Sequence, residues 1–211
     1  MRKYDFPIII PTCAIKVWHC VSMLYYKMRT SVLAWIWGVK IGEHVRFQGK
    51  TIIRTRHVDD IRLGSEVVFN SQVSTNLVGL SGPTILDTLG GGKIKVGNNT
   101  GFSSVVMSSR SSITIGSNVK VGGNVRIFDH DFHSLESKYR RTAEDRNHVR
   151  SKPVIIEDEC FIGTNAIILK GTHLGTRTIV AAGSVVFGLD VPADSMVKGN
   201  PAVVIPRKEQ K

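Results

Sequence analysis

The stretch IEDECFIGTNAIILKGTHLGTRTIVAAGSVV, residues 156–186, decides the fold, because an aliphatic residue returns at every sixth position. These residues are Ile156, Ile162, Ile168, Leu174, Val180 and Val186. The position four places after each of the first five is small or short: Cys160, Ala166, Thr172, Thr178 and Ser184. Helices repeat near 3.6 residues and half-buried strands at 2, so a period of six predicts a chain that turns a corner in every repeat. The stretch therefore predicts a parallel β-solenoid.

The same register continues toward the N-terminus, with insertions that break its phase before Val96. The earlier hexads begin at Ile115, Val121 and Ile127, at Val96 and Phe102, at Leu63 and Phe69, and at Ile41 and Phe47. Glycines that directly follow an aliphatic residue of the register include Gly42, Gly64, Gly97, Gly116, Gly163 and Gly175. Glycine permits positive φ or a close approach to the stacked coil. Three hexads make a triangular coil of about eighteen residues, so we expect roughly seven or eight coils.

Length and composition favour one globular domain with an added N-terminal segment. The chain has 211 residues, 42% of them hydrophobic, and 20 glycines that suit corners better than linkers. We expect a segment at 1–40, the solenoid at 41–205 and a basic tail at 206–211, with no second folded domain. Cys13, Cys20 and Cys160 form no paired framework, which favours a reducing cytoplasm.

Residues 1–40 contain many large apolar residues and almost no glycine. Apolar spacings of three and four predict an amphipathic helix over 13–28, with Thr12 as its cap. Pro7 and Pro11 argue against a signal peptide, and interspersed charges argue against a membrane span. We expect a helical cap on the open end of the solenoid. The alternative is a peripheral membrane foot, because Trp18, Trp35 and Trp37 lie near basic residues.

The repeat is interrupted by a loop over 128–153, and ionisable residues lie where it begins. A long loop in a repetitive fold is usually functional. Its first residues include Asp129, His130, Asp131 and His133. Two imidazoles beside two carboxylates suit proton transfer, because imidazole titrates near neutral pH and a carboxylate fixes its tautomer. Either histidine is a candidate base, and either aspartate is a candidate to orient it.

Several motifs in the C-terminal half resemble those of the hexapeptide-repeat acyltransferases, in particular the sugar and antibiotic O-acetyltransferases. The motifs are Ile115-Gly116-Ser117-Asn118-Val119 leading to His133, Phe161-Ile162-Gly163, Gly183-Ser184-Val185-Val186, Asp190-Val191-Pro192 and Gly199-Asn200-Pro201-Ala202. The resemblance covers residues 94–206 and, more weakly, extends back to Ile41. It implies a left-handed parallel β-helix, a homotrimer, and acetyl-CoA bound between neighbouring subunits.

The resemblance also implies roles for single residues. His133 matches the catalytic base, with His130 as its competitor. Thr164 and Ala182 match positions whose backbone contacts the pantetheine arm.

The chain departs from the family pattern at several positions. Phe161 replaces the family tryptophan, and Phe187-Gly188 replaces a Thr-Lys pair. We expect these three residues to contact the cofactor still, with the phosphate contacts redistributed to Lys198, Arg207 and Lys208. Ser103 or Ser104 stands where relatives have an acceptor-binding Asn, which implies a different acceptor.

The net charge of +11 calls for an anionic partner, and the phosphates of CoA, an anionic saccharide or acidic headgroups fit better than nucleic acid. Together with this charge, the resemblance implies a cytoplasmic acetyl-CoA-dependent O-acetyltransferase for a saccharide, in surface polysaccharide biosynthesis, with no metal expected. The alternatives are N-transfer to an amino sugar, a zinc enzyme like the γ-carbonic anhydrases, and a scaffold without catalysis. The histidine spacings do not suit the zinc enzyme.

Overall fold

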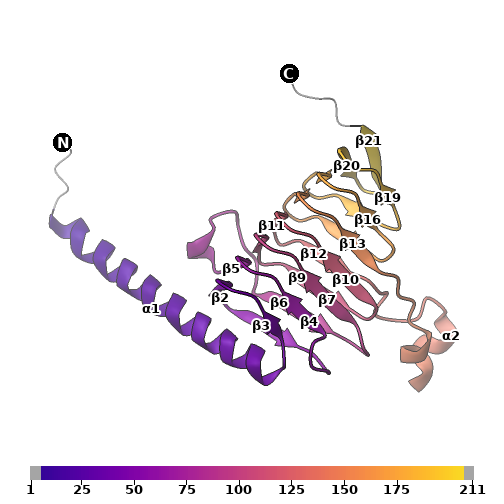
Figure 1. Cartoon of the computed structure of the whole chain (residues 1–211), viewed down its shortest axis with the longest axis horizontal. Helices are drawn as coiled ribbons and strands as arrows, with labels where there is room; N and C mark the ends of the chain where they lie inside the picture. The colour runs from indigo at the N-terminus through magenta and orange to yellow at the C-terminus, as the bar shows by residue number, and fades with distance from the viewer. Residues whose placement is uncertain (1–5, 207–211) are drawn as a thin grey trace.

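The computed structural model describes residues 6–206, with the side chains of residue 14 and of residues 16–206. Arg207 and Lys208, expected to contact CoA phosphates, lie outside the described residues. The chain forms a solenoid of three parallel sheets, which it visits in turn from the N-terminal coil to the C-terminal coil (Figure 1). The parallel β-solenoid predicted from the six-residue period is therefore confirmed.

The strands of the three sheets are as follows. Sheet A holds β1 Lys40–Ile41, β4 Ile61–Leu63, β7 Lys93–Val96, β10 Ser112–Ile115, β13 Val154–Ile156, β16 His173–Leu174 and β19 Asp190–Val191. Sheet B holds β2 Arg46–Gly49, β5 Val68–Ser71, β8 Gly101–Ser103, β11 Lys120–Gly123, β14 Phe161–Ile162, β17 Ile179–Val180, β20 Ser195–Gly199 and β21 Ala202–Pro206. Sheet C holds β3 Thr51–Arg54, β6 Thr84–Thr88, β9 Val106–Ser109, β12 Arg126–Phe128, β15 Ile167–Leu169 and β18 Val185–Val186.

Two of the three corners matter for the site. The B–C corner joins sheet B to sheet C and includes residues 163–166 and 181–184. The C–A corner joins sheet C to sheet A and includes residues 129–153, 170–172 and 187–189. Because each coil stacks on the next, residues from successive coils form a column along each corner.

The hexad residues fill the interior of the prism. Ile162, Ile168, Leu174, Val180 and Val186 are fully buried. At the N-terminal end, the rings of Phe47, Phe69 and Phe102 stack in one column, with successive centroids 5.4 and 5.0 Å apart. Side chains of equivalent positions thus pack on one another from coil to coil, which is how repeat proteins bury a continuous core.

The glycines that follow the hexad residues, such as Gly64, Gly116 and Gly163, are needed because neighbouring coils approach closely there, and not because their own φ is positive. A Cβ atom on Gly163 would lie 2.4 Å from the backbone nitrogen of Ala182, a distance that no real Cβ occupies. The left-handed residue instead stands two places after the glycine at the A–B corner, as at Glu66 (φ 58°) after Gly64 and Asn118 (φ 59°) after Gly116. Each glycine therefore permits the stacking of coils while its neighbour makes the turn.

The N-terminal helix α1, Phe6–Ile36, is longer than the helix predicted over 13–28. Thr12 lies inside it and is not its cap, because the helix already begins at Phe6. Pro7 lies in the first turn, where a missing N–H costs little, and the sequence up to Trp37 has no glycine to end the helix earlier. The C-terminal part of α1 packs on β2 and β3, where Thr30 and Ala34 are buried.

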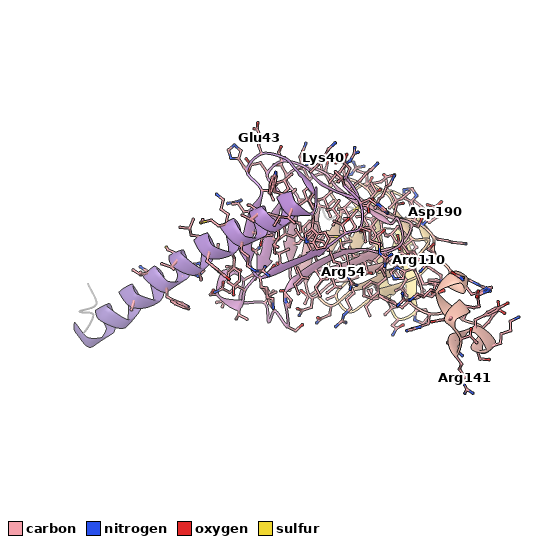
Figure 2. All side chains as sticks on the ribbon, turned by 90° about the horizontal axis from the view of Figure 1, so that it is seen from below. Lys40, Glu43, Arg54, Arg110, Arg141 and Asp190 are labelled. Carbon is pink, nitrogen blue, oxygen red and sulfur yellow. The ribbon has the colours of Figure 1, made fainter. Side chains whose placement is uncertain are left out.

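The rest of α1 extends away from the solenoid, on the side opposite to α2 (Figure 2). None of the helices in the described part of the chain has the length and apolarity needed to cross a membrane.

Two insertions leave the solenoid. Residues 72–83, between β5 and β6, contain the 3-10 helix η1 Val73–Thr75. Residues 129–153, between β12 and β13, contain α2 Ser137–Arg140 and the 3-10 helix η2 Ala143–His148. At the C-terminal end β21 turns back antiparallel on β20, with Lys198 paired to Val203. The longer insertion carries the ionisable residues that the sequence singles out.

Candidate active site

The loop over 129–153 leaves the C–A corner through a short antiparallel stem. The backbone N–H of Lys152 donates to the carbonyl of Asp129 at 2.9 Å, and that of Asp131 donates to the carbonyl of Arg150 at 3.1 Å. His130 and Ser151 form an isolated antiparallel bridge between these bonds. The stem therefore fixes Asp129 to Asp131 against the solenoid, while residues beyond it project outward.

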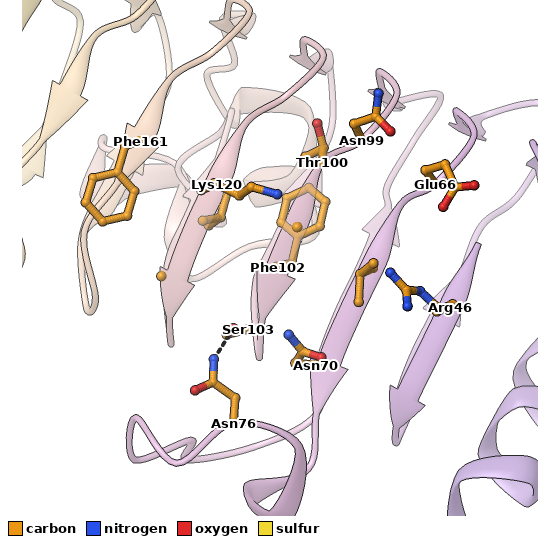
Figure 3. A pocket seen from close by; sticks show the side chains of 14 residues that line it. Arg46, Glu66, Asn70, Asn76, Asn99, Thr100, Phe102, Ser103, Lys120 and Phe161 are labelled. Atoms are coloured by element: carbon orange, nitrogen blue, oxygen red, sulfur yellow. Dashed lines mark hydrogen bonds between the residues drawn. The ribbon is translucent and has the colours of Figure 1, made fainter. Parts of the chain in front are cut away.

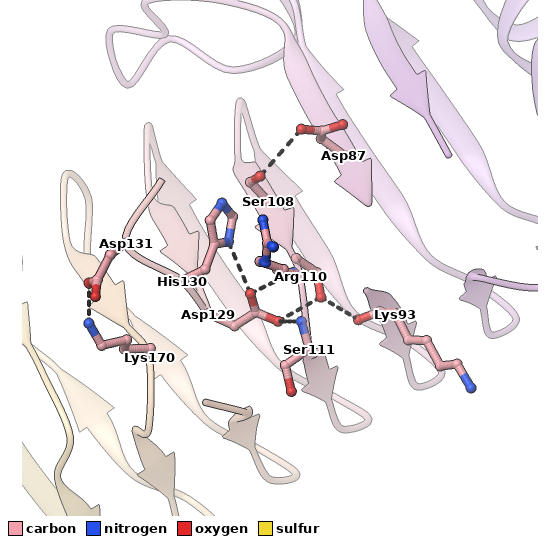
Figure 4. Close-up of polar contacts among 10 residues, drawn as sticks. Asp87, Lys93, Ser108, Arg110, Ser111, Asp129, His130, Asp131 and Lys170 are labelled. Carbon is pink, nitrogen blue, oxygen red and sulfur yellow. Dashed lines mark hydrogen bonds and ion pairs between the residues drawn. The ribbon is translucent and has the colours of Figure 1, made fainter. Parts of the chain in front are cut away.

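The carboxylate of Asp129 contacts the imidazole of His130 (Figure 4). The carboxylate of Asp129 is fully buried and accepts hydrogen bonds from Ser109 Oγ at 2.7 Å, Arg110 N at 2.7 Å and Ser111 N at 2.8 Å. Its Oδ1 also lies 3.1 Å from Nδ1 of His130. The Nε2 atom of His130 is buried and has no partner among the described residues. Of the two aspartates singled out in the sequence, Asp129 is therefore the one that contacts His130.

His133 has a different carboxylate, Asp145, which the sequence analysis did not single out. Nδ1 of His133 lies 2.7 Å from Oδ2 of Asp145, and the His133 side chain is 72% exposed. The hydrogen bond from His133 and a second from the backbone N–H of Ser134 lower the pKa of Asp145. Asp145 therefore remains ionised near neutral pH and can hold a proton on Nδ1, which leaves Nε2 free to accept one. No motif marks Asp145; only its place in an ionisable-rich loop could have suggested it.

Phe132 separates the two histidines. Its φ of 59° is left-handed, which is uncommon for a bulky residue, and His133 N donates to Asp131 O at 2.6 Å across the turn. The Phe132 ring lies 4.4 Å from the His130 ring and 4.9 Å from that of Phe128. The turn directs His130 into the fold and His133 outward. Backbone strain of this kind clusters at functional sites.

Asp131 contacts neither imidazole. It forms an ion pair with Lys170, whose side chain is only 10% exposed and whose ammonium lies 5.3 Å from the centre of the Phe187 ring. Phe187 and Gly188, both expected to contact the cofactor, lie one coil further along the same C–A corner. The corner therefore presents Lys170, Phe187 and Gly188 directly beyond the loop.

The other expected cofactor residues lie on a different part of the solenoid. Thr164 and Ala182 stand at the B–C corner one coil apart, and Gly183 N donates to Thr164 O at 2.9 Å. Lys198, on β20, follows them in the next coil. Phe161 is half exposed on the outer face of sheet B. Within one chain, the expected cofactor residues are therefore divided between the B–C corner and the C–A corner.

Ser103 and Ser104, expected to bind the acceptor, differ in their surroundings. Ser103 accepts a hydrogen bond from Asn76 at 2.8 Å and lines a hollow on the outer face of sheet B (Figure 3). Arg46, Asn70, Lys120 and Phe161 also line that hollow. The Ser104 hydroxyl is buried and has no partner among residues 6–206. Only Ser103 is therefore placed to meet a ligand, and it lies on sheet B, away from the loop's corner.

The remaining histidines give no metal centre within the described part of the chain, where no group of three or more His, Cys, Asp or Glu side chains is placed to hold an ion. His173 bridges Glu157 and Asp190 at 2.8 Å each, and the His148 ring stacks on Tyr139 with centroids 3.4 Å apart.

A family model described as the hexapeptide repeat of succinyl-transferase matches residues 153–187. A hexapeptide-repeat-containing acetyltransferase of Vibrio cholerae O1 biovar eltor, crystallised with acetyl coenzyme A, is 27% identical with a TM-score of 0.55 over 87% of this chain and 78% of that one. The chain is similar to the hexapeptide-repeat acyltransferases in this segment and in its fold. Its fold is the left-handed parallel β-helix, as the resemblance implied.

Three other similar proteins also carry the names of acyltransferases. A point mutant of the Bacillus cereus N-acyltransferase AntD, crystallised with dTDP-4-amino-4,6-dideoxyglucose and coenzyme A, has the same fold, with a TM-score of 0.66 at 17% identity over 86% of this chain and 89% of that one. The Bacillus subtilis (strain 168) protein YvoF, which carries the name of an acetyltransferase, is 35% identical over 121 residues, or 56% of this chain. A 2,3,4,5-tetrahydropyridine-2,6-dicarboxylate N-acetyltransferase of Staphylococcus aureus (strain JH9) is 54% identical over 55 residues, or 26% of this chain. The matches span 63% of YvoF and 23% of the staphylococcal enzyme, less than two thirds of either.

Proposed function

We propose that the protein is an acetyl-CoA-dependent O-acetyltransferase that modifies a saccharide hydroxyl, with His133 as general base. The observation that carries the proposal is the His133–Asp145 pair. Its imidazole is exposed, hydrogen-bonded at Nδ1 to a carboxylate and free at Nε2. A histidine supported in this way presents its other ring nitrogen to an acceptor hydroxyl as a general base.

The chemistry follows from the free nitrogen. His133 Nε2 removes the proton from the acceptor hydroxyl as the oxygen forms its bond to the thioester carbonyl carbon. The carbon–sulfur bond then breaks, and the imidazolium gives its proton to the departing thiolate. The imidazole of His133 is then neutral again and ready for the next turnover. Asp145 stabilises the imidazolium that exists between the two transfers. Hydroxyl oxygen is a poor nucleophile at neutral pH, and general-base help of this kind contributes about 10²–10⁴-fold in rate.

The donor site we propose lies between two copies of the chain in a homotrimer. One copy supplies the loop and the C–A corner with Lys170, Phe187 and Gly188. The neighbour supplies the B–C corner with Thr164 and Ala182. Both corners have open surface for an approaching ligand, because a Cβ atom added at Gly183 or at Gly188 would meet nothing within 4 Å. Lys198 would contact the CoA phosphates from the end of the B–C column.

His133 is favoured over His130 as base because of access. The side chain of His130 is 1% exposed, so its Nε2 reaches a substrate only if the loop moves. Asp129, which holds it, also closes the turn between β9 and β10 through Arg110 N and Ser111 N, which suits a structural role. We therefore assign Asp129 and His130 to positioning the loop.

The test uses the purified full chain with acetyl-CoA and a panel of saccharides, with thiol release as the readout. His133→Asn should lower kcat by at least about a hundredfold while leaving the affinity for CoA unchanged. His130→Asn is the matched control and should retain most of kcat if it folds. The reverse result would make His130 the base. Transfer to amino sugars alone would establish N-acetylation, and release from no acceptor together with no binding of CoA would refute the acyltransferase itself.

We also propose that α1 holds the enzyme at an acidic membrane surface on the cytoplasmic side. The face of α1 that points away from the solenoid carries an apolar stripe, here called the outer stripe, whose side chains are 55–81% exposed. It consists of Val17, Trp18, Val21, Leu24, Tyr25, Met28, Val32, Trp35 and Ile36. The helix contains no Asp or Glu, and Lys16, Lys27 and Arg29 flank the stripe. Exposed aromatic and aliphatic residues with only basic neighbours suit an interfacial helix.

A further inference from the structure

A basic hollow adjoins His133 on the N-terminal side of the loop. It is lined by four arginines, Arg54, Arg56, Arg110 and Arg146, together with the His133–Asp145 pair. Arg54 and Arg56 come from the coil that begins the solenoid, Arg110 from the turn between β9 and β10, and Arg146 from η2 of the loop. Elements far apart in the sequence therefore bring four guanidinium groups to one side of the proposed base.

Most of this positive charge is not neutralised. Arg54 forms a bidentate pair with Asp87, at 2.6 and 2.8 Å, which compensates its charge. Arg110 donates from its guanidinium to the carbonyl of Arg146 at 2.6 Å, a contact that fixes the group without a carboxylate. The guanidinium groups of Arg56 and Arg146 form no ion pair within residues 6–206. The carboxylate of Asp145 is already bonded to His133.

We propose that this hollow binds a negatively charged group on the acceptor, so that the substrate is an anionic saccharide bearing a carboxylate or a phosphate close to the accepting hydroxyl. The guanidinium group presents a planar fork of donors that matches carboxylate and phosphate oxygens. A neutral sugar would leave the Asp145 carboxylate alone to offset the three guanidinium groups of Arg56, Arg110 and Arg146. The inference rests on the proposed function, since it takes His133 to be the base that the acceptor must reach.

The position of the hollow separates the acceptor from the donor. The arginines belong to coils that precede the loop and to η2, whereas Lys170, Phe187 and Gly188 belong to coils that follow it along the same corner. Arg110 and Lys170 stand on the two sides of the stem that carries Asp129 and His130 (Figure 4). His133 thus lies between a basic hollow and the corner assigned to CoA, where a base must lie to link the two substrates.

The experiment compares glucose, glucuronate and glucose 1-phosphate, first by equilibrium titration into the full-length protein. At least one of the two anions should bind to the wild-type protein at least about tenfold more tightly than glucose does. Arg56→Gln should weaken the binding of that anion about tenfold, as expected for the loss of hydrogen bonds to a charged group. Arg141→Gln is the matched control, because Arg141 is an exposed arginine of the same loop outside the hollow. It should leave binding unchanged.

Steady-state kinetics with the best acceptor then distinguishes the acceptor from CoA as the source of the anion. Arg56→Gln should raise the KM for the acceptor about tenfold and leave the KM for acetyl-CoA unchanged. A rise in the KM for acetyl-CoA instead would assign the arginines to CoA phosphates and overturn the proposal. Equal binding of glucose and the anions by the wild type would overturn it as well. Failure of the proposed acyltransferase function itself would be recognised separately, because acetyl-CoA would then not bind.

Discussion

His133 and Asp145 lie on opposite arms of one loop, yet Nδ1 of the first stands 2.7 Å from Oδ2 of the second. Asp145 is 14% exposed, and its other oxygen accepts the backbone N–H of Ser134 at 2.7 Å. The backbone bond fixes the carboxylate, and the carboxylate fixes the imidazole. The two hydrogen bonds that orient His133 therefore both come from residues of the loop itself.

Asp145→Asn should lower kcat about a hundredfold with little change in either KM, because an amide no longer stabilises the imidazolium and can favour the wrong tautomer. The measurement is thiol release at saturating acetyl-CoA. Glu144→Gln is the control, since Glu144 is the adjacent carboxylate and contacts Asn147 instead. Wild-type turnover in Asp145→Asn would show that the pair plays no part in catalysis.

A methyl group at Gly163 tests the stacking of coils. The Cβ atom of Gly163→Ala would lie 2.4 Å from the backbone of the next coil, which cannot move without shifting a strand. We expect a loss of roughly 2–4 kcal/mol in the free energy of unfolding, measured by urea denaturation. Gly101→Ala is the control, because its nearest atom is the Lys120 side chain at 3.8 Å, and it should change stability by less than about 0.5 kcal/mol.

The fold could be predicted because the period of six repeats the same packing requirement in every coil. Ile162 and Val180 show the same burial because each stands at the same point of its triangle. The length of α1 could not be predicted in this way. Its residues pack on the solenoid on one face and leave apolar residues exposed on another, so a pattern for a single buried face located only part of the helix.

The site was predictable only in part, for a related reason. Asp129 and His130 are sequence neighbours, so their contact follows from local chain direction. Asp145 reaches His133 through the fold of an irregular loop, which has no period. Thr164 and Phe187 were assigned to one ligand by resemblance, but the triangular section places them at different corners. Composition and spacing say nothing about which corners meet in an assembly.

The stability of the C-terminal coils should depend on pH through His173. Its hydrogen bond to Glu157, with a further one to Asp190, raises the pKa of His173 above the ordinary 6.5. A raised pKa means that the stabilisation is fully present below about pH 6.5 and is lost as the pH rises through the higher folded value. The hydrogen bonds from Thr176 and His173 lower the pKa of Glu157 below 4.5, so its contribution persists until the pH falls through that lower value.

His173→Gln should therefore lower stability more at about pH 5.5 than at about pH 8.5. The effect will be below about 1 kcal/mol, because these side chains are partly exposed and solvent screens them. Urea denaturation of both proteins at the two pH values gives the comparison. A difference that grows with pH would contradict the assigned pairing.

The outer stripe of α1 predicts binding to acidic vesicles. The double variant Trp18→Gln, Trp35→Gln should lose co-sedimentation with vesicles of phosphatidylcholine and phosphatidylglycerol, while the wild type binds and is released by salt. Leu77→Gln is the control, since Leu77 is 85% exposed outside the helix.

Stripe residues such as Val21, Met28 and Trp35 are also spaced as in a helix–helix seam. Conversion of the double variant to a smaller oligomer, with vesicle binding intact, would make the stripe a subunit interface.

Mixing two inactive variants tests whether the active site is shared between copies. His133→Asn removes the base at the C–A corner, and Ala182→Trp should block the pantetheine path at the B–C corner. If each site takes one corner from each of two subunits, unfolding and refolding the variants together should restore roughly a quarter of the wild-type rate, because that fraction of interfaces joins two intact corners. Refolding either variant alone controls for recovery by other routes. A site contained within one chain predicts no recovery in the mixture, since every chain then carries one of the two lesions.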